Sequence, residues 1–222
     1  MKSKIIVIEG LDGSGKATQT ALLAKKLEQL NRAYKKLEFP DYDSPSSSLV
    51  KMYLNGEFGE DPNSVNAYAA AAFYAVDRVA SYLKSWKKDY ENGMLFLCDR
   101  YATSNIIYHM SKVPDGKRDE FIRWHSDFEY NKLGIPKPDL VLYLDVEPEV
   151  SQKLMEKRYN GDLSKKDLHE KNVNYLLSCR RSALYAAEKC GWKVINCCEN
   201  GEIKSIEKIA REIEEAAKNI LC

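Results

Sequence analysis

The stretch Glu9-Gly10-Leu11-Asp12-Gly13-Ser14-Gly15-Lys16-Ala17 decides the fold class of this chain. It directly follows the apolar run Ile5-Ile6-Val7-Ile8, which reads as a buried strand. Gly10, four further residues and then Gly15-Lys16 have the spacing of a P-loop, in which backbone N–H groups turn toward a polyphosphate and the lysine meets its outer oxygens. Residues 18–31 have helical periodicity, so we expect the phosphates at a helix N-terminus.

One position of this loop departs from the usual pattern. The pattern ends in Ser or Thr because that hydroxyl contacts the magnesium ion of the nucleotide, but this chain has Ala17 there. The neighbouring Thr18 is expected to point a different way on the first helical turn, so we expect water or a carboxylate to replace the missing ligand. The alternative is a glycine-rich turn between a strand and a helix, with Lys16 merely at the surface.

Length, charge and cysteine usage limit the kind of protein. The 222 residues fall in the single-domain range, so we expect one domain over residues 1–222. The 34 Lys and Arg residues nearly balance the 33 Asp and Glu residues, which gives no reason to expect nucleic acid or a membrane as a partner. The six cysteines lack the CxxC spacing of a zinc site, and Met1-Lys2-Ser3-Lys4 leads into the first strand without an apolar signal segment. We therefore expect a reduced, cytoplasmic protein, with Cys98 packed in a buried strand.

Short apolar segments alternate with longer segments of helical periodicity. The predicted strands are residues 4–9, 34–39, 94–98, 140–145 and 193–197. This alternation is typical of an α/β protein whose parallel sheet is covered by helices on both faces. Residues 67–90 read as one long helix. The closing helix is expected to carry an apolar stripe made of Ile203, Ile206, Ile209, Ile213 and Ile220.

The residues after each strand are the best candidates for function, because ligands of open α/β sheets bind at the carboxyl ends of the strands. Phe39-Pro40-Asp41-Tyr42 follows the second strand and Asp99-Arg100-Tyr101 the third. In Asp99-Arg100-Tyr101 the carboxylate could hold magnesium through water, and the guanidinium could bind a phosphate through two hydrogen bonds. The phenol is the next residue along the chain. Between the last two strands, residues 157–162 form a basic, glycine-containing segment that could close as a lid.

Tyr74 and Arg78 are four residues apart in a predicted helix and therefore share a face. The aromatic ring could stack on a nucleobase while the arginine binds the edge of the base or its phosphate. Phe73 is the competing stacking residue. The alternative is that the aromatic residues belong to the core and that Asp77-Arg78 is solvated.

Several of these motifs together resemble the thymidylate kinase family. The resemblance is carried, in this order and at similar separations, by Gly10-Leu11-Asp12-Gly13-Ser14-Gly15-Lys16, Phe39-Pro40-Asp41, Tyr74-Ala75-Val76-Asp77-Arg78, Asp99-Arg100-Tyr101 and Lys137-Pro138-Asp139-Leu140. Ser104-Asn105 and Tyr108, after the third strand, make it more specific. It implies a three-layer P-loop NTPase fold with a five-stranded parallel sheet and a short lid. It also implies Mg²⁺-dependent transfer of the ATP γ-phosphoryl group to dTMP, giving dTDP and ADP for dTTP synthesis.

The resemblance assigns residues to each substrate. The ATP site would consist of Gly10, Leu11, Asp12, Gly13, Ser14, Gly15, Lys16, Ala17 and Thr18. The dTMP site would consist of Asp12, Phe39, Pro40, Tyr42, Leu54, Tyr74, Arg78, Arg100, Ser104, Asn105 and Tyr108. The residues with catalytic roles would be Lys16, Asp12, Arg100 and Arg158, with Asp99 holding magnesium through water.

Individual roles follow from the same resemblance. Asp12 would reach the sugar 3′-hydroxyl or the phosphate region, and Tyr74 would stack on thymine where the family usually has phenylalanine. Arg78 would bind the edge of the base, and Ser104 and Asn105 would approach it. Arg100 would hold the acceptor phosphate, and Tyr108 would crowd the sugar 2′ position and so favour deoxyribose.

Family members with a small residue at the place of Gly13 take a catalytic cation from the lid. The lid is expected at about residues 157–170, with Arg158, Lys165 and Lys166 as candidates, although Arg158 could instead lie against adenine. Tyr42 stands where some members have a phosphate-binding arginine, which leaves more of that charge to Arg100. The family also implies a homodimer through helix packing, for which the alanine-rich helix 65–82 is a candidate.

Two other functions stay open at the level of sequence. The first is a kinase for another deoxynucleoside or nucleotide, in which Glu9 or Asp41 would act as the base. The second is a nucleotide-binding regulatory protein that has lost turnover, for which Ala17 is the motive. His109, His125 and His169 are expected to be packed or solvated, because no nucleophile is paired with them.

Overall fold

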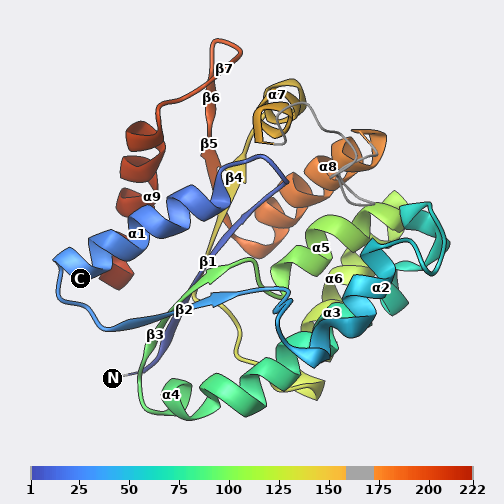
Figure 1. Cartoon of the computed structure of the whole chain (residues 1–222), viewed down its shortest axis with the longest axis horizontal. Helices are drawn as coiled ribbons and strands as arrows, with labels where there is room; N and C mark the ends of the chain where they lie inside the picture. The colour runs from blue at the N-terminus through green and yellow to red at the C-terminus, as the bar shows by residue number, and fades with distance from the viewer. Residues whose placement is uncertain (1, 159–172, 222) are drawn as a thin grey trace.

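A five-stranded parallel sheet forms the centre of the computed structural model, which describes residues 2–158 and 173–221 (Figure 1). Its strands are β1 (Lys4–Gly10), β2 (Tyr34–Glu38), β3 (Leu95–Asp99), β4 (Leu140–Asp145) and β5 (Lys193–Asn196). Their order across the sheet is β2-β3-β1-β4-β5, and every neighbouring pair is parallel. The predicted α/β class and the five predicted strands are therefore confirmed.

Helices cover both faces of this sheet. They are α1 (Lys16–Gln29), α2 (Ser48–Leu54), α3 (Ala67–Ser81), α4 (Lys87–Glu91), α5 (Thr103–His109), α6 (Arg118–Ser126), α7 (Pro148–Arg158), α8 (Val173–Cys190) and α9 (Ile206–Leu221). Figure 1 shows α1 and α9 on one side of the sheet and α3, α5, α6 and α8 on the other. None of the helices in the described ranges is long and apolar enough to cross a membrane.

The alternation of side chains along β1 explains the two layers. Ile5 and Val7 belong to the core under α5 and α8, whereas Ile6 and Ile8 belong to the core under α1 and α9, and all four are fully buried. Because both faces of β1 are covered, its sequence is continuously apolar instead of alternating.

Two expectations about helices were wrong in detail. Residues 67–90 do not form one regular α-helix, because a π-helical turn at Tyr82–Trp86 separates α3 from α4. Tyr82 and Trp86 are both buried there, with ring centroids 4.6 Å apart, so packing of the large rings accompanies the wider turn. The last helix begins at Ile206, and Ile203 lies instead in β7 (Glu202–Ile203), which pairs with β6 (Cys198–Glu199) in a small antiparallel hairpin.

The register of the sheet brings the candidate residues to one edge. Ile8 on β1 is level with Asp99 on β3, and Gly10 is level with Leu144 on β4. The P-loop and the segment that starts at Arg100 therefore leave the sheet side by side. Most of the expected lid, including Lys165 and Lys166, lies outside the described residues, as does the side chain of Arg158 at the end of α7.

Candidate active site

The P-loop adopts the conformation that its glycines allow. Gly13 and Gly15 have φ angles of 78° and 83°, in the left-handed region that side chains disfavour. Gly15 is the N-cap residue of α1 and provides no side chain to cap the helix, so the first N–H groups of α1 face the loop. A Cβ on Gly10 would collide with the side chain of Ser14. The loop therefore presents backbone donors to an anion.

The loop forms the floor of an open pocket, here called the P-loop pocket. The described residues that line it include every member of the expected ATP set from Asp12 to Thr18, together with Asp99 and Arg100. Ile203, Lys204 and Ile206 from the hairpin and the start of α9 line another part of it. Sequence reasoning placed Ile203 and Ile206 in the apolar stripe of the closing helix and assigned neither of them, nor Lys204, to a binding site.

Lys16 is held in this pocket as a nearly buried cation. Its Nζ donates a hydrogen bond of 2.8 Å to the carbonyl of Leu11 and lies 3.8 Å from Oδ1 of Asp12. Burial lowers the pKa of Lys16 to about 8, and the nearby Arg100 acts in the same direction, although the Asp12 carboxylate acts in the opposite one. The ammonium is therefore a poorly solvated charge that gains from contact with a phosphate.

The P-loop pocket offers few side-chain ligands for a magnesium ion. No group of three or more His, Cys, Asp or Glu side chains that could hold a metal occurs among the described residues. Asp99 lines the pocket at the end of β3, and Ala17 lines it without a hydroxyl. Mg²⁺ keeps several waters and often takes only one or two carboxylates in addition to the phosphates of the substrate, so this donor set fits it.

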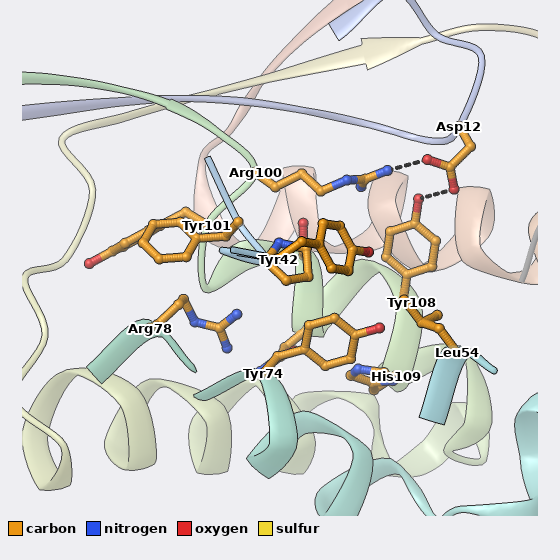
Figure 2. A pocket seen from close by; sticks show the side chains of 13 residues that line it. Asp12, Tyr42, Leu54, Tyr74, Arg78, Arg100, Tyr101, Tyr108 and His109 are labelled. Carbon is orange, nitrogen blue, oxygen red and sulfur yellow. Dashed lines mark hydrogen bonds and ion pairs between the residues drawn. The ribbon is translucent and has the colours of Figure 1, made fainter. Parts of the chain in front are cut away.

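A second cavity, here called the acceptor cavity, lies on the other side of Asp12 (Figure 2). Its free volume is about 90 Å³. All eleven residues expected at the dTMP site line it, so the structure brings this whole set together. Tyr101 and His109 complete the lining.

Asp12 and Arg100 belong to both pockets and join them. One oxygen of the Asp12 carboxylate accepts from Arg100, and the other accepts from the hydroxyl of Tyr108 at 3.0 Å, as Figure 2 shows. Arg100 also donates to the carbonyl of Gly10 at 3.2 Å, and its guanidinium lies 5.1 Å from the centre of the Tyr108 ring. Arg100 has a φ of 63°, an uncommon conformation for a residue other than glycine. These contacts hold a cation at the boundary between the two pockets.

Arg78 is not solvated but almost completely buried, at 1% exposure. Its guanidinium makes a two-point contact with the carboxylate of Glu129, which is itself fully buried. Burial by itself lowers the pKa of Arg78, but the Glu129 carboxylate outweighs burial and the pKa ends above its ordinary value. Glu129 also accepts a hydrogen bond of 2.8 Å from the side-chain amide of Asn105.

Sequence reasoning missed Glu129. It lies in a π-helical turn, Asp127–Lys132, 51 residues from Arg78 and 24 residues from Asn105. The only local signal is its i, i+4 spacing from His125, which places these two on one helix face. His125 is buried, as expected of a packed histidine, and its Nε2 meets the carbonyl of Ala102 at 2.8 Å.

A second buried carboxylate, Glu9, organises the start of α5. It accepts hydrogen bonds from Thr103 at 2.7 Å, from Ser104 at 2.8 Å and from the backbone of Tyr101 at 3.2 Å. Burial raises the pKa of Glu9, and the nearby Arg100 and these donors act in the opposite direction. Ser104 lines the acceptor cavity, but its hydroxyl is directed to Glu9.

The aromatic residues of the cavity divide into two groups. Tyr74 lines the cavity, with its ring centroid 5.3 Å from that of His109, whereas Phe73 packs against Phe58 and Tyr53 outside the lining. The phenol of Tyr101 does not join Asp99 and Arg100, contrary to the grouping expected from sequence. It donates instead to the carbonyl of Pro136 at 2.9 Å and points away from Arg100 in Figure 2.

A P-loop pocket and a second cavity that share a carboxylate and an arginine, at the edge of a parallel α/β sheet, define the class of P-loop phosphotransferases. The family model described as thymidylate kinase matches residues 8–213. The thymidylate kinase of Mycobacterium tuberculosis is 30% identical over 186 residues, covering 82% of this chain and 84% of its own. The thymidylate kinase of Danio rerio is 26% identical over 220 residues, which cover 99% of this chain and 92% of its own. The solved structure of the Candida albicans thymidylate kinase has the same fold, with a TM-score of 0.70 at 22% identity over 99% of this chain and 92% of its own.

The chain belongs to the thymidylate kinase family. It is an enzyme that transfers the γ-phosphoryl group of ATP to dTMP, giving dTDP and ADP. The comparisons do not favour the two alternatives left open by the sequence, a kinase for another nucleoside and a regulatory protein without turnover.

Proposed function

We propose that the acceptor cavity binds dTMP and that the P-loop pocket binds the triphosphate of ATP. The observation that carries this assignment is that the two pockets share Asp12 and Arg100. Two anions bound in pockets that share a cation are placed for direct transfer, and such positioning supplies most of the catalysis in phosphoryl transfer. The chain would act as one kinase domain over residues 1–222.

The proposed roles follow from the contacts. Lys16 and the first N–H groups of α1 bind the β- and γ-phosphates, and Arg100 binds the acceptor phosphate beside them. A lid cation, with Arg158 as the first candidate, would complete the neutralisation of charge on the transferred group. No strong general base is needed, because the acceptor phosphate is already anionic at neutral pH.

We propose Mg²⁺ as the metal that accompanies ATP. When bound, it neutralises charge on the phosphate oxygens. Asp99 is the residue of the P-loop pocket that would hold it, through water, since Ala17 has no oxygen in its side chain.

The base and sugar would be recognised by the remaining residues of the cavity. Tyr74 offers a stacking face, with Phe39, Pro40 and Leu54 as apolar neighbours. Tyr108, fixed through its hydroxyl by Asp12, would occupy the space of a ribose 2′-hydroxyl. Tyr42 offers a hydroxyl near the acceptor phosphate.

We also propose a cytoplasmic homodimer. Tyr68, Val76 and Leu83 recur every seven or eight residues along α3 and the π turn, and they are 38%, 47% and 62% exposed. An apolar stripe of this kind on one helix face supports an interface with a second copy. No disulfide joins the cysteines of the described residues, which suits a reducing compartment.

The assignment is tested by ADP release from ATP and Mg²⁺ with a panel of acceptors, namely dTMP, dUMP, dCMP, dGMP and free thymidine. We expect dTMP to give the largest kcat/KM. A Lys16→Met variant should lose turnover with every acceptor, which excludes a contaminating kinase. Preference for free thymidine, or turnover that survives Lys16→Met, would contradict the assignment.

A further inference from the structure

The buried carboxylate of Glu129 meets two of the polar residues of the acceptor cavity that are expected to contact the base, Arg78 and Asn105. Its Oε2 accepts from Nε of Arg78 at 3.2 Å, and its Oε1 accepts from Nη2 of Arg78 and from Nδ2 of Asn105. Glu129 itself is fully buried and does not line the cavity. It therefore acts on a ligand only through Arg78 and Asn105.

The contacts of Asn105 fix which atom of its amide faces the cavity. Its Nδ2 has two hydrogens, and they go to the Ala71 carbonyl at 3.0 Å and to Glu129 at 2.8 Å. Both partners are acceptors only, so the opposite orientation of the amide would bring its oxygen against two other oxygens. Asn105 lines the cavity, and the atom left to face it is Oδ1, an acceptor.

The contacts of Arg78 fix its guanidinium in the same way. Nε and Nη2 are bound to Glu129, and Nη1 donates to no residue of the described part of the chain. Arg78 lines the cavity as well, so it presents a donor there. The two residues together offer a donor next to an acceptor.

Among the described residues, Glu129 has only one cationic partner. His125 lies 3.8 Å from Glu129, but burial lowers its pKa to about 4, so it is neutral at physiological pH. Its Nε2 faces the Ala102 carbonyl, which can only accept, so that nitrogen carries the proton. The carboxylate therefore depends on Arg78 for its charge balance, and it is an acceptor toward both Arg78 and Asn105.

We propose that Glu129 is a positioning residue that sets base specificity by holding Arg78 as a donor and Asn105 as an acceptor toward the cavity. Thymine presents an O4 acceptor and an N3–H donor, which match this pair. Cytosine presents an N4 amino donor and an N3 acceptor, which oppose it at both positions. The inference rests on the proposed binding of dTMP in this cavity.

Glu129→Gln and Glu129→Asp are a matched pair for the test. Both oxygens of Glu129 accept from Arg78, so the Gln side chain places an amide donor against Arg78 in either orientation, and the guanidinium must turn. Asp has a shorter reach but, like Glu, can only accept. We expect Glu129→Gln to lower the ratio of kcat/KM for dTMP over dCMP by about tenfold to a hundredfold. KM for dTMP should rise, while KM for ATP and the ratio of dTMP over dUMP should stay unchanged, because uracil has the same edge. Glu129→Asp should keep the dTMP preference even where its KM rises.

Binding of dTMP and dCMP, measured by calorimetry without ATP, gives the same ratio where turnover is too low.

Asp145→Asn is the control for removing a paired carboxylate elsewhere. Asp145 is bound by Nε and Nη2 of Arg180 at 2.7 and 2.8 Å and lines neither pocket, so the variant should keep the wild-type ratio. The proposal is overturned if Glu129→Gln keeps the dTMP over dCMP ratio, or if Glu129→Asp lowers that ratio as much as Glu129→Gln does. Failure of the wild-type enzyme to phosphorylate dTMP is a different result, which overturns the proposed function itself.

Discussion

The P-loop pocket and the acceptor cavity are built in different ways, although they share Asp12 and Arg100. The phosphate-facing part of the first comes from one short run of sequence, and much of its affinity for anions comes from backbone N–H groups at the start of α1. The second is assembled from side chains of separate elements, among them α3 and α5, and from Glu129 behind them. A local sequence motif therefore forms the phosphate-binding part of the site. Tertiary packing forms the acceptor cavity, the part that would distinguish one acceptor from another.

The cations of the two regions also differ in their partners. In the acceptor cavity Arg78 is paired with Glu129 and Arg100 with Asp12, so each guanidinium is held in place before a ligand arrives. In the P-loop pocket Lys16 bonds to a carbonyl and lies 3.8 Å from Asp12. The paired arginines are therefore held in fixed positions, whereas Lys16 supplies a charge that titrates near physiological pH.

The largest effect is expected from Arg100→Ala, which should lower kcat/KM for dTMP by about a thousandfold, as for other cations at a transferring phosphoryl group. Part of the loss comes from Asp12, whose carboxylate would lose the closer of the two cations beside it, with Lys16 left at 3.8 Å, and would repel the acceptor phosphate more strongly. Steady-state kinetics with each substrate varied in turn measures the effect. Arg180→Ala is the control, because this arginine is paired with Asp145 and lines neither pocket. An equal loss in dTMP binding and ATP binding would show that Arg100 is not chiefly an acceptor-side residue.

An intermediate effect is expected from pH. The pKa of Lys16 is lowered to about 8, so its ammonium is charged below that pH and is lost progressively above it. The phosphates of ATP favour the charged form, so kcat/KM for ATP should fall above about pH 8, approaching tenfold per pH unit. A pH profile at saturating dTMP measures this.

Lys112 provides the control for that profile, because burial also lowers its pKa to about 8. Its Nζ bonds to the Tyr53 hydroxyl and to the Val65 carbonyl, and it does not line the P-loop pocket. A Lys112→Gln variant should keep the fall above about pH 8. Loss of the fall in that variant would assign the titration to Lys112 and not to Lys16.

The smallest effect is expected from Ala17→Ser, which restores the hydroxyl of the usual P-loop pattern. Because Mg²⁺ can keep a water where that hydroxyl would bind, we expect less than about a threefold change in the Mg²⁺ concentration that half-activates the enzyme. Titration of activity with Mg²⁺ at fixed ATP tests this, with Thr18→Ala as the neighbouring control. A tenfold or greater gain would mean that position 17 limits metal binding in this chain.

The residues that could be predicted from the sequence are those whose role is local. The P-loop was visible because glycine, lysine and the flanking strand and helix occur in one run. The strands were visible because β1 and β4 are short, continuously apolar runs, as expected of strands that are buried on both faces. The hairpin β6–β7 was missed because strands of two residues carry no period at all.

The acceptor side was predictable only through the family resemblance. Spacing alone left Arg78 as either a ligand-binding or a solvated residue and left Phe73 and Tyr74 undecided. The structure separates the two aromatic residues, because Tyr74 lines the cavity and Phe73 packs on Phe58 and Tyr53. A one-residue difference along a helix turns a side chain by about 100°, which follows from 3.6 residues per turn, but only the neighbours decide which direction is the cavity.

The sequence by itself determined the α/β class, the order of the strands along the chain and a phosphate site at the end of β1, because these depend on periodicity and on backbone conformations that glycine permits. Only the tertiary structure decided that Glu129 would meet Arg78 and Asn105 and that Asp12 would join Arg100 to Tyr108. These partners lie 24 to 96 residues apart in the chain. A buried charge needs a partner, but nothing in its own segment says where in the chain that partner will be found.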